Sequence, residues 1–261
     1  MECEAIEFEV DDEHVATITL NRPEANNAWN DQMAREISWA WGTIRDDDDV
    51  HAVVLRANGE RAFCTGADVR GGVSWFFSSN VWNTFDPGQT LSPKSHHRCW
   101  KPVVVAVQGM CAGGGQYFLN EADIVIASED ATFFDPHANG GIVSALEPIG
   151  MLHRGVPLGD VLRWALMGTE ERITAATAMR LGLVTEVVPG ADLRARAHQI
   201  ATGIAARNPR AIQGTVRAIW ESLDMSRSIA LQNGIAYTNI GNPPAGDGSP
   251  RRRVNREPTY R

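Results

Sequence analysis

Two patterns of apolar residues alternate along the chain. Short apolar runs, several of them rich in β-branched residues, lie at 14–20, 52–55, 102–107 and 124–127. After Asn30 and Asp31, which fit a helix cap, apolar residues instead recur every three or four positions, as Met33, Ile37, Trp41 and Ile44. Because strand-like and helix-like segments alternate, the pattern predicts an α/β domain with a mostly parallel sheet and a site at the strand ends.

The last third of the chain has the periodicity of helices. Their predicted ranges are 159–167, 174–181, 192–206 and 209–223. Pro243 and Pro244 follow, and the basic run Arg251–Arg253 lies near the end. We expect a core over residues 1–190 and a C-terminal helical region with a tail over 191–261, whose charge run is solvated.

Composition limits the class of protein. The 261 residues are 43% apolar and 21% charged, as in an ordinary soluble protein. The net charge of −8 argues against broad nucleic-acid binding. No apolar run approaches the roughly 20 residues of a membrane helix, and the start of the chain is acidic, so we expect a cytoplasmic protein with no membrane partner.

The sequence offers no convincing metal site. The four cysteines have no Cys-x-x-Cys spacing, which argues against a zinc site or a disulfide framework. The acidic run at 46–49 is typical of a solvated loop, and the pair His96 and His97 has no third ligand nearby in the sequence. We therefore expect no bound metal.

Two glycine-containing turns follow apolar strands and suggest chemistry. One spans 61–68, and the other spans 109–116 and contains Gly113, Gly114 and Gly115. Glycines in a row are costly in regular structure, so a bare backbone is needed there, either for close crossing of two segments or to present N–H groups. N–H groups at the start of a helix can stabilise an oxyanion.

Together the turns resemble the crotonase (enoyl-CoA hydratase/isomerase) family, with its Phe-Cys-x-Gly-Ala-Asp and Gly-x-x-x-Gly-Gly-Gly patterns. Further matches begin at Asn21, Lys101, Ala122, Ala131 and Gly182. The resemblance implies the crotonase spiral fold of repeated ββα units, an acyl-CoA thioester substrate, no tightly bound cofactor, and a homotrimer or dimer of trimers. It also implies that the N–H groups of Ala67 and Gly114 form the oxyanion hole.

The chain departs from the family where hydratases use two glutamates. The first glutamate position is Tyr117, and the second is His137 in the run Phe133–His137. A tyrosine, with a reference pKa of about 10, is a poor base, whereas a histidine, at about 6.5, suits proton transfer near neutral pH. We predict that His137 is the general acid or base; a histidine that is merely hydrogen-bonded in a loop is the alternative.

Three residues are candidates to assist His137. Glu147 either partners His137 or simply favours the helix dipole as an N-terminal charge. Tyr117 is a second candidate from its family position. Asp135 is a weaker one, since its side chain suits capping the turn before Pro136.

The resemblance also implies a set of substrate-binding residues. Aromatic residues of the segment 71–100 would shape the acyl pocket, with packing inside the loop as the alternative. Arg22 and Arg217 would reach the coenzyme A phosphates; the alternative for each is a surface ion pair. For Asp68, the alternative to substrate binding is a structural role in the turn that contains it. The predicted set is Arg22, Ala25, Asp68, Trp75, Phe76 and Trp82.

The sequence thus predicts an enoyl-CoA hydratase-like lyase or isomerase with atypical catalytic residues. One alternative is a hydrolase of carbon–carbon bonds in β-diketones, which the Pro-His and Gly-Ile-Val segments around 136–143 resemble. The other is a catalytically silent acyl-CoA-binding protein. The position of His137 relative to the two N–H groups should distinguish an enzyme from the silent protein.

Overall fold

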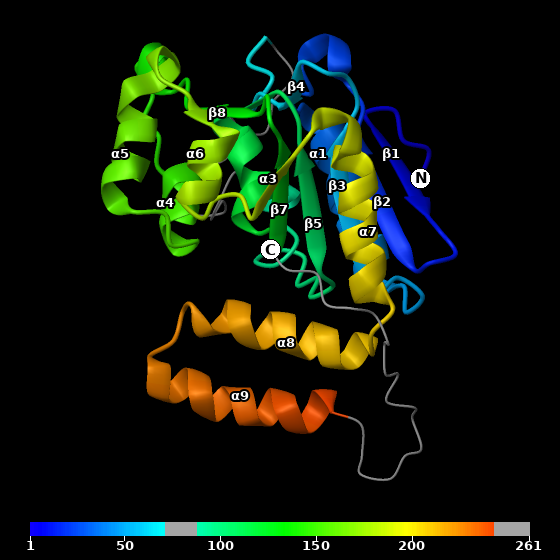
Figure 1. The fold of residues 1–261 in the computed structure, drawn as a ribbon. Helices are drawn as coiled ribbons and strands as arrows, with labels where there is room; N and C mark the ends of the chain where they lie inside the picture. Colours follow the sequence, from blue (N-terminus) through cyan, green and yellow to red (C-terminus); the bar gives the residue numbers. More distant parts are fainter. Residues whose placement is uncertain (71–87, 243–261) are drawn as a thin grey trace. The chain divides into compact units, whose positions relative to one another are not determined.

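The computed structural model describes residues 1–70 and 88–242 (Figure 1). The chain divides into two compact units, Met1–Ala206 and a second that begins at Arg207. The predicted division at residue 190 falls before helix α7 (Leu193–Ala205), whose apolar face packs on the sheet of the first unit.

The first unit is built on a six-stranded sheet. All neighbouring strands are parallel except the first pair, β1 and β2. In spatial order the strands are β1 (Ile6–Val10), β2 (Val15–Leu20), β3 (Ala52–Ala57), β5 (Val103–Val107), β7 (Ile124–Ser128) and β10 (Glu186–Val188). The α/β class predicted from the apolar pattern is confirmed.

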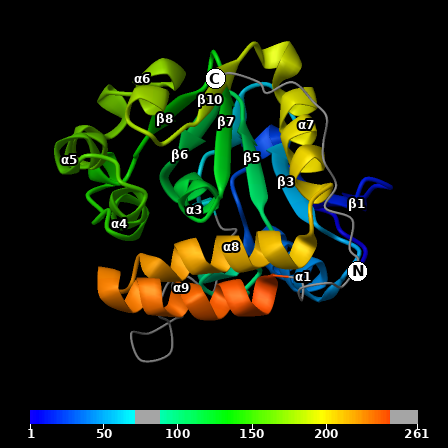
Figure 2. The ribbon, with the colours of Figure 1, turned by 60° about the horizontal axis from the view of Figure 1, so that its bottom comes forward.

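Helices cover both faces of this sheet. Helix α1 (Asp31–Asp46) packs on one face with Val53 and Leu55, while α7 packs on the other with Ala52 and Val54 (Figures 1 and 2). Successive strand residues point to opposite faces, so a strand covered on both sides must be apolar throughout. This explains the uninterrupted apolar runs of the sequence.

A smaller four-stranded sheet carries the loops of interest. Its strands, in spatial order, are β4 (Ala62–Cys64), β6 (Met110–Ala112), β8 (Thr132–Phe134) and β9 (Ile173–Thr174). Strands β4, β6 and β8 are parallel, and each follows a strand of the large sheet. Because parallel strands end at the same edge, the turns after Cys64, Ala112 and Phe134 lie side by side.

The remaining helices are of two kinds, those within the predicted ranges and others outside them. In the first unit they are α3 (Gln116–Asn120), α4 (Leu146–His153), α5 (Leu158–Met167) and α6 (Ala175–Arg180). The second unit contains α8 (Pro209–Ser222) and also α9 (Arg227–Gly241), which the apolar pattern did not predict. The succession β5–β6–α3 and β7–β8–α4 is the expected ββα repeat.

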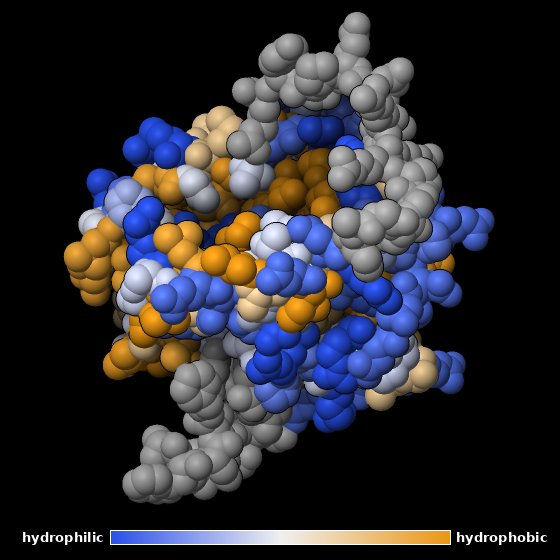
Figure 3. Space-filling model, turned by 90° about the horizontal axis from the view of Figure 1, so that it is seen from below, coloured by the Kyte–Doolittle hydropathy of each residue, from blue (hydrophilic) through white to orange (hydrophobic). Residues whose placement is uncertain are grey.

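Large apolar side chains reach the surface of several helices. In α5, Leu158, Leu162 and Leu166 are exposed, and the face drawn in Figure 3 shows apolar side chains (orange) among polar ones (blue). Within residues 1–70 and 88–242, no helix combines the length and apolar character needed to cross a membrane.

Candidate active site

The two predicted glycine turns are in contact. Gly66 has a φ of +90°, and a Cβ atom built on it would lie 2.9 Å from the backbone nitrogen of Gly114 and 3.2 Å from the carbonyl oxygen of Ala112. Such distances leave no room for a side chain, and the positive φ also favours glycine. Gly66 therefore lets the turn after β4 pack directly on the turn after β6.

The glycines of the second turn are similarly enclosed. A Cβ on Gly115 would lie 2.6 Å from the carbonyl oxygen of Cys64, and one on Gly114 would lie 2.8 Å from Nε1 of Trp29. The three glycines 113–115 form a 3₁₀ turn that leads into α3. Close crossing of backbones, one of the two alternatives from the sequence, thus occurs at this turn.

Trp29 sets the direction of the Ala67 backbone. These two residues form a parallel β-bridge, in which the N–H of Trp29 donates to Gly66 O at 2.8 Å and the N–H of Asp68 donates to Trp29 O at 2.9 Å. In such a bridge the N–H of the central residue points away from the partner segment. The N–H of Ala67 is therefore directed away from the Trp29 backbone.

His137 lies beside the glycine turn, between two acidic side chains. Its Nδ1 is hydrogen-bonded to Oδ1 of the fully buried Asp135, which also accepts from the backbone N–H of His137 at 3.1 Å. Its Nε2 lies 3.9 Å from Oε1 of Glu147, at the start of α4. A Cβ on Gly113 would be 3.7 Å from Cε1 of the imidazole. His137 and Glu147, both predicted from the sequence, are thus brought together.

The acidic neighbours shift the titration of His137. The hydrogen bond to Asp135 raises the pKa of the imidazole above its ordinary value of 6.5; burial opposes this, and the charges of Asp135 and Glu147 add to the increase. For Asp135, burial would raise the pKa, but hydrogen bonds from His137 and Ser144, together with the charge of His137, outweigh it and the pKa is lowered. An ionised Asp135 that accepts from Nδ1–H leaves the Nε2 of neutral His137 as the proton acceptor.

The sequence pattern that defines the enoyl-CoA hydratase/isomerase family matches residues 11–237 of this chain. The chain belongs to that family. It is 33% identical to (E)-benzylidenesuccinyl-CoA hydratase of Thauera aromatica, covering 87% of this chain and 85% of the relative. It is also 33% identical to the short-chain-enoyl-CoA hydratase of Clostridium acetobutylicum, with 83% and 82% covered.

Solved structures of the family share the fold. An enoyl-CoA hydratase/isomerase from Mycobacterium paratuberculosis superposes with a TM-score of 0.82 at 39% identity, covering 91% of this chain and 90% of that one. An enoyl-CoA hydratase from Bacillus anthracis gives a TM-score of 0.79 at 25% identity, covering 90% of each chain. The crotonase fold expected from the motifs is confirmed.

In this member of the family, Tyr117 lies in a different environment from His137. It is part of the short helix α3, is only 6% exposed and belongs to the apolar core. A Cβ on Gly88 would lie within 2.4 Å of three atoms of its ring. The structure therefore gives Tyr117 close packing and places the charged groups around His137.

Some of the predicted substrate-binding residues lie within the described residues and others lie outside them. Arg22 and Asp68 pair with each other, with Nη2 and Oδ2 3.0 Å apart, and Ala25 ends a short 3₁₀ turn between them in sequence. Arg217 of the second unit pairs with Glu221 at 2.9 Å. Trp75, Phe76 and Trp82 lie outside the described residues.

Other polar groups near the turns are poor candidates for chemistry. Burial raises the pKa of the Cys64 thiol to about 12 and that of Cys111 well above its ordinary value, so neither is a ready nucleophile. His97 is buried against Ser38 and Ser92, while His96 is exposed. In the described part of the chain, one group of side chains is spaced closely enough to hold a metal ion. It consists of Asp11, Glu13 and His198, which are far from the glycine turns in the sequence.

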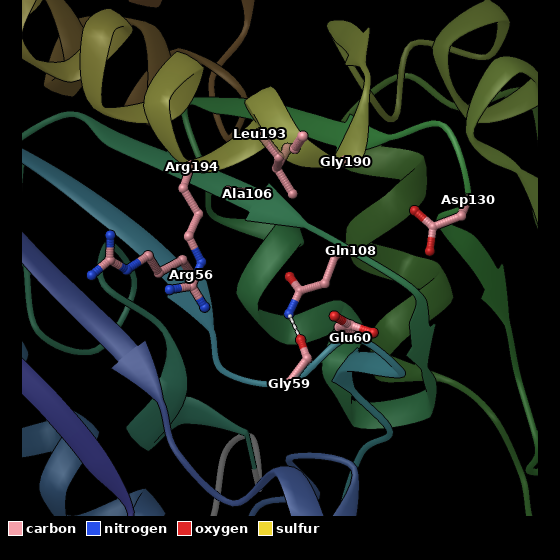
Figure 4. Close-up of a pocket in the computed structure, with 10 residues that line it drawn as sticks. Arg56, Gly59, Glu60, Ala106, Gln108, Asp130, Gly190, Leu193 and Arg194 are labelled. Atoms are coloured by element: carbon pink, nitrogen blue, oxygen red, sulfur yellow. Dashed lines mark hydrogen bonds between the residues drawn. The ribbon is translucent and has the colours of Figure 1, made fainter.

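A hollow of about 770 Å³ lies elsewhere, beside the start of α7 (Figure 4). Gln108, between β5 and β6, donates to the carbonyl oxygen of Gly59 at 2.9 Å across this hollow. Arg194 donates to Ala57 O at 2.9 Å, and Glu60 and Asp130 supply acidic groups. None of the predicted catalytic residues lines this hollow.

The sequence undervalued Asp135, which binds His137, and missed Trp29, which contacts both glycine turns. Asp135 was expected to cap a turn, and it does accept from the N–H of His137, but it also binds the imidazole. An Asp two residues before a His is the spacing of such a turn, so this signal was present. Trp29 had no comparable signal, because its contacts join segments far apart in the chain.

Proposed function

We propose that this chain is an enzyme that acts on an acyl-CoA thioester, with the N–H groups of Ala67 and Gly114 as an oxyanion hole and His137 as the general acid or base. The observation that carries the proposal is the position of His137. Its imidazole adjoins Gly113, in the same turn as Gly114, and is flanked by Asp135 and Glu147. This is the arrangement expected of an enzyme rather than of a silent acyl-CoA-binding protein.

The oxyanion hole would stabilise an enolate. Two fixed N–H donors directed at the thioester oxygen favour the charge that develops when a proton leaves Cα or a nucleophile adds to Cβ. Loss of one such donor typically costs about 3 kcal/mol of transition-state stabilisation. Contact between the two turns through Gly66 brings the donors close together.

His137 would move the proton. In hydration, Nε2 takes a proton from water as the water oxygen bonds to Cβ, and the imidazolium so formed then delivers a proton to Cα as the enolate collapses. Asp135 fixes the tautomer by accepting from Nδ1–H and stabilises the imidazolium that forms. Glu147, 3.9 Å from Nε2, is close enough to hold a water or to assist the second proton transfer.

The acyl group is the open part of this proposal. The two hydratases above are named for an aromatic and for a short-chain thioester, so relatives at 33% identity differ in acyl group. Coenzyme A enters as part of the substrate, and the proposal needs no tightly bound cofactor. The exposed leucines of α5 suit the homotrimer or dimer of trimers implied by the family.

A second candidate function is hydrolysis of a carbon–carbon bond in a β-diketone or a 3-oxoacyl-CoA. The His137–Asp135 pair favours it, because a histidine oriented by a buried carboxylate is a common activator of water. Attack of that water on the 3-oxo carbon would break the bond to C2. The products would be a carboxylic acid and, after protonation of the thioester enolate, a shortened acyl-CoA.

The test is a panel of esters followed by mass spectrometry. Purified wild type and His137→Ala would be mixed with crotonyl-CoA, bulkier enoyl-CoA esters and 3-oxoacyl-CoA esters. Addition of water to an enoyl ester, lost in the variant, supports the first candidate, and cleavage of a 3-oxoacyl ester supports the second. Tight binding of esters without turnover by either protein would contradict both and favour the silent binding protein.

A further inference from the structure

We propose that Trp29 is a positioning residue that fixes the two oxyanion-hole donors relative to each other. This inference rests on the proposed function, because it assigns a role toward the N–H groups of Ala67 and Gly114. Trp29 lies in the segment just before α1 and belongs to neither glycine turn. It nevertheless contacts both, one through its backbone and the other through its side chain.

The backbone of Trp29 fixes the first turn. Its N–H and C=O groups bind Gly66 O and the Asp68 N–H, at 2.8 and 2.9 Å, on either side of Ala67. The peptide planes around Ala67 therefore cannot rotate without breaking these bonds. The direction of the Ala67 N–H thus depends on where the Trp29 backbone lies.

The indole of Trp29 fixes the second turn. A Cβ on Gly114 would lie 2.8 Å from Nε1 and 3.4 Å from both Cε2 and Cζ2, so the edge of the ring covers the bare Cα of this glycine. Trp29 is 1% exposed and belongs to the apolar core, which restricts movement of the ring. Gly114 therefore cannot move toward the indole.

The segment that carries Trp29 is itself anchored on both sides. Before it, the Asn27 side chain donates to Asn58 O at 2.9 Å and to Ala62 O at 3.0 Å. After it, the Asn30 side chain accepts from the N–H of Met33 at 2.9 Å and caps α1. The segment that carries Trp29 is therefore held by the residue after β3, by β4 and by α1, as a segment that determines the spacing of two donors should be.

The chemical consequence follows from the precision that an oxyanion hole requires. Donors stabilise the developing charge only when they lie near 2.7–3.1 Å from the oxygen, and a displacement of 1 Å can cost about 100-fold in rate. Replacing the indole with a smaller group removes the contact with Gly114 but leaves the backbone bonds to the first turn. The two donors then lose their fixed spacing while the fold persists.

The test measures polarisation of the thioester carbonyl directly. Crotonyl-CoA labelled with ¹³C at C1 would be bound to wild type, Trp29→Phe and Trp29→Leu, and the carbonyl stretch recorded by difference infrared spectroscopy. Trp41→Phe is the matched control, because Trp41 is also a buried tryptophan, in α1, and donates to Leu91 O at 3.0 Å away from both turns. Melting curves would establish that each variant is folded.

We expect the wild type and Trp41→Phe to lower the carbonyl frequency equally, and Trp29→Leu to lower it less, with Trp29→Phe between them. For the most active ester of the panel, kcat should fall about 10- to 100-fold in Trp29→Leu, while KM changes less than about threefold. A role confined to stability would lower the melting temperature but leave the carbonyl frequency of the folded variant unchanged.

The outcomes separate this inference from the proposed function. If the wild type does not shift the carbonyl frequency, the oxyanion hole itself is wrong. If the wild type shifts it and both folded Trp29 variants shift it equally, with unchanged kcat, the positioning role is wrong. If Trp29→Leu does not fold, Trp29→Phe and the double variant with Gly114→Ala decide, since the two single losses should not be additive when Trp29 and Gly114 act as one unit.

Discussion

Tyr117 and His137 occupy the two positions at which family hydratases use glutamates, and their surroundings differ sharply. Tyr117 is 6% exposed in the apolar core, whereas the side chain of His137 is 22% exposed and faces two carboxylates. His137 thus lies beside charged side chains, whereas Tyr117 packs in the core. The proposed mechanism therefore uses a single side chain with two acidic neighbours for proton transfer, rather than a pair of acids.

The local backbone explains the difference. Tyr117 lies in α3, whose residues 116–119 are all buried. His137 follows the end of β8, where Asp135 accepts from its N–H and turns the chain. A strand end at the edge of a parallel sheet exposes side chains to a ligand, as in other α/β proteins.

The largest expected effect comes from His137→Ala. General acid–base catalysis typically contributes 10²–10⁴-fold, so we predict a loss of about 10³-fold in kcat on the preferred ester, with the protein still folded. Steady-state kinetics would measure it, with His96→Ala as a control that alters an exposed histidine. A loss below about threefold would remove His137 from the mechanism.

Asp135→Asn should produce the next largest effect. The amide no longer stabilises the imidazolium, so we expect kcat/KM to fall about 10- to 100-fold. Because Asp135 raises the pKa of His137 and the neutral imidazole is the base, the rate of the wild type should rise with pH through a pKa above 6.5. In the variant this acid limb should move to lower pH; a pH–rate profile with an unmoved limb would contradict the assignment.

Glu147→Gln should act in the same direction but less strongly. Its oxygen is 3.9 Å from Nε2, beyond a direct hydrogen bond, so it raises the pKa of His137 through charge alone. We predict a loss of about threefold to tenfold and a smaller movement of the acid limb to lower pH. An effect larger than that of Asp135→Asn would identify Glu147 as the main partner of His137.

Tyr117→Phe should have the smallest effect on rate. The ring packing is retained and only the hydroxyl is removed, so we expect kcat within about threefold of the wild type and a stability change of about 1 kcal/mol or less. Kinetics together with chemical denaturation would measure both. A loss of 100-fold without unfolding would show that both family positions take part in catalysis.

The sequence predicted the features that depend on local periodicity and on recurrent turns. Apolar runs at 52–55 and 102–107 became central strands, and the spacing of Met33 and Ile37 became α1. Helix α9 was missed because glycine and polar residues, such as Asn233 and Gly234, interrupt its apolar positions and none of its side chains is buried. Periodicity cannot reveal such a helix.

The candidate site was only partly predictable for a related reason. His137 followed from its place in a local pattern, and Asp135 is two residues away. Glu147 depended on how the chain folds back after β8, and Trp29 on contacts with turns more than 35 residues ahead. Long-range packing of this kind is specified by the whole core and leaves no short signature in the sequence.

The central claim is that His137 moves a proton at Cα of a thioester held by the oxyanion hole. The most direct measurement is the exchange of Cα protons of butyryl-CoA, a saturated ester, in D₂O, followed by NMR with wild type, His137→Ala and Tyr117→Phe. The account predicts exchange with the wild type, about the same rate with Tyr117→Phe, and a loss of about 10³-fold with His137→Ala. Equal exchange by the wild type and a folded His137→Ala variant would contradict it.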